Sequence, residues 1–93
     1  MRGMEWEEVR RDWEERSFSC GLWTDPPGQV WPDFVHAVDE LVMLVEGKMA
    51  LSFGGKTVRP ALGEEILIPA GTKHTVENPG NTVNRWFYGY RRQ

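Results

Sequence analysis

The sequence is poor in several features that would each assign it to a class. Among its 93 residues Cys20 is the only cysteine, so an intrachain disulfide is excluded and we expect a reducing, cytoplasmic setting. No stretch approaches the ~20 consecutive apolar residues of a transmembrane helix, so we expect no membrane partner. Charged residues follow the first four positions directly, and such a start predicts no signal peptide.

A basic tract is missing as well. The formal net charge is −3, and an acidic balance without a basic face gives no support for nucleic acid as a partner. A chain of 93 residues has about the length of one domain. So small a domain buries a limited apolar area and often gains stability from a bound metal or a partner subunit.

The chain begins with a pattern typical of a helix. Trp6, Val9 and Trp13 recur at intervals of three and four residues within 5–16, among charged residues. This narrow apolar stripe predicts a helix that packs across one end of a sheet. A helix that binds a partner protein is the alternative. We expect a helical segment at 1–16 and a β domain at 17–93.

From residue 17 onward the pattern is that of short strands. Turn residues rich in Gly, Pro and Asn interrupt the chain near 25–28, 54–55, 69–71 and 78–81. The intervening stretches predict seven to nine strands, hence an all-β sandwich or barrel. Within the predicted strand 29–37, Pro32 requires an edge or a bulge.

Residues 41–45 form an apolar run without polar interruption. A strand of this kind has both faces buried. One face can point into the barrel, and the other needs a neighbouring sheet or a second subunit as cover. We therefore expect a homodimer.

Two stretches carry spaced Gly, Pro, His, Glu and Asn residues. Residues 63–78 fit GxxxxxPxGxxHxxxN at every fixed position, a match expected by chance on the order of once in a hundred thousand such chains. Residues 28–47 fit GxxxxxHxHxxxExxxxxxG, except that Phe34 stands at the first histidine position. These motifs resemble the two signature motifs of the cupin family, in particular small single-domain cupins. The resemblance implies a cupin-type jelly-roll β-barrel.

The resemblance also implies a metal site. In similar cupins three histidines and a glutamate hold the metal, and the matching positions here are His36, Glu40 and His74. Two neutral imidazoles and one carboxylate suit a divalent ion such as Fe, Mn, Ni or Zn, and they leave coordination positions free. Phe34 cannot ligate. Two outcomes stay open: a three-ligand metal site with a more apolar wall, or a remnant site that binds a small organic ligand without metal.

Cupins include dioxygenases, isomerases, epimerases and decarboxylases, so the fold does not select a reaction. Our first hypothesis is a metal-dependent enzyme of the oxygenase or isomerase type that acts on a small organic molecule. We assign no catalytic residue beyond the metal ligands. The alternatives are a non-catalytic small-molecule or metal-binding sensor module, and a structural dimeric barrel without metal.

Other candidate side chains have simpler interpretations. Asp39 has the opposite strand parity to Glu40, so we expect it to point outward or to lie in a turn. The pair at 64–65 is interpreted as a solvated turn, and Cys20 as a small buried hydrophobic residue. The many aromatic residues are expected in the core, in an interface or around a pocket, and parity alone does not decide whether Trp86 or Phe87 points inward.

Overall fold

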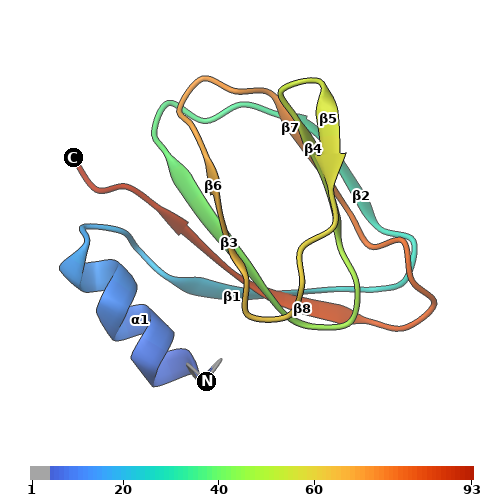
Figure 1. Cartoon of the computed structure of the whole chain (residues 1–93), viewed down its shortest axis with the longest axis horizontal. Helices are drawn as coiled ribbons and strands as arrows, with labels where there is room; N and C mark the ends of the chain where they lie inside the picture. The colour runs from blue at the N-terminus through green and yellow to red at the C-terminus, as the bar shows by residue number, and fades with distance from the viewer. Residues whose placement is uncertain (1–4) are drawn as a thin grey trace.

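The computed structural model describes residues 5–93 and consists of one helix followed by eight strands (Figure 1). In chain order the elements are α1 (Trp6–Glu15), β1 (Gly21–Asp25), β2 (Val30–Phe34), β3 (Glu40–Glu46), β4 (Ala50–Phe53), β5 (Lys56–Val58), β6 (Glu65–Ile68), β7 (His74–Glu77) and β8 (Asn84–Tyr90). The predicted all-β architecture with a short N-terminal helix is therefore confirmed.

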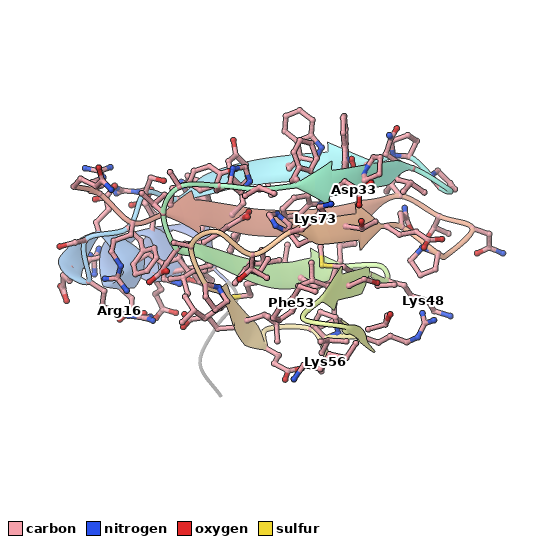
Figure 2. All side chains as sticks on the ribbon, turned by 90° about the horizontal axis from the view of Figure 1, so that it is seen from above. Arg16, Asp33, Lys48, Phe53, Lys56 and Lys73 are labelled. Atoms are coloured by element: carbon pink, nitrogen blue, oxygen red, sulfur yellow. The ribbon has the colours of Figure 1, made fainter. Side chains whose placement is uncertain are left out.

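The strands form two four-stranded sheets, in the orders β1-β8-β3-β6 and β2-β7-β4-β5, and every pairing is antiparallel. The sheets enclose a barrel, and α1 lies outside it (Figure 1). Seen from above, Arg16 lies at the end where α1 packs and Lys48 at the opposite end (Figure 2). The inward faces of both sheets supply one hydrophobic core, made of Val42, Leu44, Met49, Leu51, Ile68, Val76 and Trp86.

A second core lies between α1 and the outer face of the first sheet. Val9 and Trp13 of the helix are fully buried, and they pack with Leu41, Met43 and Phe87. The predicted burial of both faces of β3 is confirmed, but the cover differs from our expectation. It comes from a helix of the same chain rather than from a neighbouring sheet or a second subunit, because the apolar stripe of α1 matches this face.

Polar contacts fix the helix on the sheet. The indole N–H of Trp13 donates to Glu65 Oε1 over 2.9 Å, and the Arg16 guanidinium donates to both Glu65 oxygens over 2.9 and 2.7 Å. The interpretation of Glu65 as a solvated turn residue was wrong, because it is the first residue of β6 and anchors the helix. After the helix ends, Ser17 adopts a positive φ of 68°, and the Phe18 N–H bonds back to the Trp13 carbonyl over 2.8 Å.

Local turn chemistry agrees with the sequence. Gly54 and Gly55 have φ angles of +61° and +78° and join β4 to β5 as the predicted hairpin. Pro32 lies in β2, an edge strand whose register shifts between Trp31 and Phe34. Among residues 5–93, no helix has the length and apolar character required to cross a membrane.

The helix contact generates a stability prediction. We expect Trp13→Ala to lower the free energy of unfolding by about 3–5 kcal/mol, since it removes a fully buried indole and leaves a cavity. Arg11→Ala, at an exposed position of the same helix, should change it by less than about 0.5 kcal/mol. Urea unfolding at fixed pH measures both, and equal effects for the two variants would contradict the packing described.

Candidate metal centre

Three predicted site residues meet at one end of the barrel, although they come from different segments. His36 lies in the loop between β2 and β3, Glu40 is the first residue of β3, and His74 is the first residue of β7. Glu40 Oε1 lies 3.5 Å from His36 Nε2 and 3.2 Å from His74 Nε2. One ligand atom from each residue lies within 4.8 Å of the other two.

The protonation pattern of His74 makes this meeting point a cluster of acceptors. His74 Nδ1 lies 3.2 Å from the Thr72 carbonyl, and a carbonyl can only accept, so Nδ1 carries the proton in this contact. In the neutral ring Nε2 then presents a lone pair toward Glu40. Glu40 Oε1 is itself buried and has no hydrogen-bond partner among the described residues. A lone pair facing a carboxylate oxygen requires a proton or a cation between them.

The electrostatic environment of the three groups follows from their burial. Burial raises the pKa of Glu40 to about 7, because the protein interior disfavours its charge. Burial, followed by the neighbouring His74, lowers the pKa of His36. The imidazole of His36 is therefore neutral near pH 7, which is the form that binds metals.

The distances fit a metal ion. Nitrogen and carboxylate ligands bind zinc at ~2.0–2.2 Å, so two ligands separated by about 90–115° around an ion lie roughly 3.0–3.5 Å apart. The two Glu40 contacts, 3.2 and 3.5 Å, fall in this range. The carbonyl that accepts from His74 Nδ1 is the kind of partner that fixes ring orientation in metal-binding histidines. The residues present thus fit a divalent ion.

Backbone contacts hold the two motifs together. The Gly71 N–H donates to the His36 carbonyl over 2.8 Å, and the Ala70 N–H donates to Asp39 Oδ1 over 2.8 Å. Arg91 also donates to Asp39 Oδ2, over 3.0 and 3.2 Å. The Ala70 N–H, followed by Arg91, lowers the pKa of Asp39. Asp39 therefore lies in the loop before β3, which is one of the two positions we expected. Its carboxylate joins the turn that contains Ala70 to the C-terminal segment that contains Arg91.

Phe34 occupies the wall beside the ligands. Its ring centroid lies 6.0 Å from that of His36 at an interplanar angle of 12°, and 6.2 Å from that of His74. At the position where the motif has its first histidine, the chain thus presents an aromatic face to both imidazoles.

The three polar residues form one end of a cavity of about 280 Å³. Apart from them, it is lined by Trp23, Trp31, Phe34, Val76, Trp86, Tyr88 and Tyr90. Strand alternation alone did not decide whether the side chain of Trp86 or that of Phe87 points into the barrel. In the structure Trp86 lines this cavity, whereas Phe87 packs against α1. Cys20 is half-buried beside the second core, and burial raises the pKa of its thiol to about 11.

Sequence reasoning missed one residue near the cavity. Asp25 was interpreted only as part of a turn, but it is the last residue of β1, is 1% exposed, and accepts hydrogen bonds from three tryptophan side chains. No spacing signal in the sequence identifies this role, because the tryptophans come from three separate strands.

Burial of Glu40 generates a pH prediction for the metal-free protein. Its raised pKa means that the folded state binds the proton more tightly than the unfolded state, so this group costs stability as pH rises from 4.5 through about 7. Glu40→Gln is neutral throughout. In the presence of a chelator, we compare the free energy of unfolding of Glu40→Gln with that of the wild type. We expect the difference to shift in favour of the variant by about 2 kcal/mol between pH 5 and pH 8.

The control is Glu46→Gln, an exposed carboxylate at the other end of β3. Its stability relative to the wild type should be the same at both pH values. Urea unfolding at pH 5 and pH 8 measures the differences. A Glu40→Gln difference that does not change with pH would show that the carboxyl group is not desolvated in the fold.

Comparison with known proteins agrees with the fold. A family model described as the Cupin domain matches residues 21–90. An uncharacterised protein of Streptomyces coelicolor is 35% identical over 60 residues, which cover 64% of this chain and 57% of that protein. The chain thus aligns with little more than half of that relative's length.

Solved structures share the fold. A Cupin 2 conserved barrel domain protein of Salinispora arenicola has a TM-score of 0.72 at 21% identity, with 99% of this chain and 73% of that chain covered. A predicted oxalate decarboxylase of Thermotoga maritima has a TM-score of 0.74 at 20% identity, with 89% and 74% covered. At these identities the likeness concerns the fold alone. With the family model covering most of its length, the chain belongs to the cupin family.

Proposed function

We propose that this cupin binds one divalent metal ion through His36, Glu40 and His74 and uses it on a small organic molecule in the adjoining cavity. One observation carries the proposal. Glu40 Oε1 is buried without a hydrogen-bond partner among the described residues, and His74 Nε2 lies 3.2 Å from it. A metal ion satisfies all three groups at once.

The ligand set defines the chemistry to test. Two neutral imidazoles and one carboxylate leave a divalent site with a net charge of about +1 and with open positions. Fe, Mn, Ni and Zn all suit such a set. A bound ion would supply Lewis acidity or, if redox-active, activation of dioxygen. This matches the enzyme of oxygenase or isomerase type that the sequence suggested.

The chain's own residues would orient the substrate and limit water around it. The cavity walls beyond the ligands are largely aromatic. Tyr90 also lines the cavity, and burial, followed by the charges of Glu40 and Tyr88, raises its pKa to about 12. Its phenol therefore stays protonated near neutral pH and can donate a hydrogen bond to a ligand. The Tyr90 ring lies next to His36, with 4.8 Å between the two ring centroids.

A binding module without turnover is the second candidate. The observation that favours it is Phe34, which replaces one ligand by an aromatic ring that lies against both imidazoles. Such a wall suits retention of an organic ligand. Incubation with a panel of enol or thiol substrates separates the two candidates. Oxygen uptake detects an oxygenase and product analysis detects an isomerase, whereas a binding module leaves every substrate unchanged.

Metal content tests the ligand assignment. The protein is purified without a histidine tag, reloaded with Fe(II), Mn(II), Ni(II) or Zn(II), and analysed by elemental mass spectrometry. We expect about one ion per chain and a several-fold loss in His74→Ala, because the remaining two ligands bind weakly. Glu46→Gln is the matched control and should keep its metal. Metal content unchanged in His74→Ala would remove His74 from the site, and no binding of any ion would refute the proposal.

Phe34→His tests whether the chain has lost a fourth ligand. An imidazole at this position would lie beside both existing histidine rings, so we expect zinc affinity to rise by about tenfold or more, equivalent to ~1.4 kcal/mol. Competition with a chromophoric chelator measures the affinity. An affinity equal to or below that of the wild type would show that position 34 does not face the ion.

A further inference from the structure

The cavity has two chemically different ends. The proposed ligands form one end, and four aromatic side chains, Trp23, Trp31, Trp86 and Tyr88, lie at the other. Its volume of about 280 Å³ is at the lower limit of the ~300–1,000 Å³ typical of ligand pockets. It therefore suits a molecule of about one ring with a small substituent.

One buried carboxylate orients three of the four aromatic side chains. The indole N–H groups of Trp23 and Trp31 donate to Asp25 Oδ1 over 2.8 and 2.9 Å, and that of Trp86 donates to Oδ2 over 3.1 Å. The three tryptophans come from β1, β2 and β8, hence from both sheets. Asp25 does not itself line the cavity. The polar edges of the indoles are thus satisfied by Asp25, and no indole N–H is left to be matched by a ligand.

Among these four side chains, the rings that meet do not stack face to face. Trp23 meets Trp31 at 72° and Tyr88 at 82°, and Trp86 meets Tyr88 at 63°, all in edge-to-face geometry. Gly21 leaves room for the Tyr88 ring, since a Cβ on this glycine would lie 2.6 Å from Tyr88 Cζ. Walls already held in place bind a flat ring with little ordering cost.

The exposure of Trp23 indicates that the aromatic end of the cavity is open to a ligand and is not simply part of the hydrophobic core. Its side chain is 42% exposed, although Asp25 holds it in one orientation. A large apolar group that is both exposed and fixed gains from covering by a ligand.

The charge at the metal end of the cavity determines which polar group of a ligand can bind there. With a divalent ion, two neutral imidazoles and one carboxylate, the site carries about +1, so an anionic oxygen ligand neutralises it and a cationic one is repelled. We propose that the cavity binds a single-ring aromatic acid, with its acidic oxygen at the metal and its ring between the tryptophans that Asp25 orients. This inference rests on the proposed metal site and makes Asp25 a positioning residue.

Benzoate is the probe, and zinc is the metal because it is redox-inert. Zinc content is measured first. Calorimetry and tryptophan fluorescence then give the dissociation constants of benzoate, acetate and benzylammonium for the zinc-loaded full chain. We expect benzoate to bind at least about tenfold more tightly than acetate, because only benzoate covers the aromatic walls. Benzylammonium should bind more weakly than benzoate.

Variants separate ring binding from metal binding. Asp25→Asn has nearly the same shape, but it brings an amide N–H toward one indole N–H, so the walls lose their common acceptor. We expect about a tenfold loss of benzoate affinity, with zinc content and acetate affinity changed less than twofold. If Asp25→Asn does not fold, Trp23→Leu at the exposed end of the wall should give the same selective loss. Glu46→Gln, remote from the cavity, is the control.

Each result has a separate meaning. If zinc binds but benzoate binds no more tightly than acetate, or more weakly than benzylammonium, this inference is overturned and the metal proposal stands. If the chain binds neither zinc nor Fe(II), Mn(II) or Ni(II), both proposals are overturned. Full benzoate selectivity in the folded Asp25→Asn and Trp23→Leu variants shows that the carboxylate only holds the sheets together, and it overturns the role of the tryptophan wall.

Discussion

Two imidazoles and one carboxylate meet at one point, where Glu40 and His74 are buried and His36 is partly exposed, and this crowding constrains the residues around it. An unsatisfied buried acceptor costs about 1–3 kcal/mol, and the oxygen of Glu40 is such an acceptor among the described residues. It persists because the fold places both imidazoles against it, 3.2 and 3.5 Å away. A proton on Glu40, whose pKa is raised to about 7, or a bound cation would relieve this cost.

The surrounding structure is organised to hold that point. The last residue of the second motif, Asn78, is fully buried and donates to the carbonyls of Pro26 and Thr82 over 3.1 and 2.9 Å, so it fixes the turns opposite the site. The helix covers the outer face of β3, which lets the strand that carries Glu40 remain apolar on both sides. Aromatic side chains then line most of the cavity wall beyond the ligands.

Much of this was predictable from the sequence. Glycine and proline spacing located the turns, uninterrupted apolar residues marked β3, and the two motifs identified His36, Glu40 and His74 as residues that would converge. What escaped prediction depends on contacts between distant strands. Asp25 gains its role from indoles on three strands, and Glu65 gains its role from a helix about fifty residues away. Alternation of side chains also gives two equivalent solutions for β8, and the choice depends on tertiary contacts, since Phe87 packs against the helix and Trp86 packs in the barrel core.

Anomalous diffraction at the zinc edge from crystals of the zinc-loaded protein would locate the bound ion. We expect one strong peak inside the barrel, ~2.0–2.2 Å from Nε2 of each histidine and from a carboxylate oxygen of Glu40. A peak located elsewhere, or its absence at this point while the three side chains keep their positions, would contradict the account.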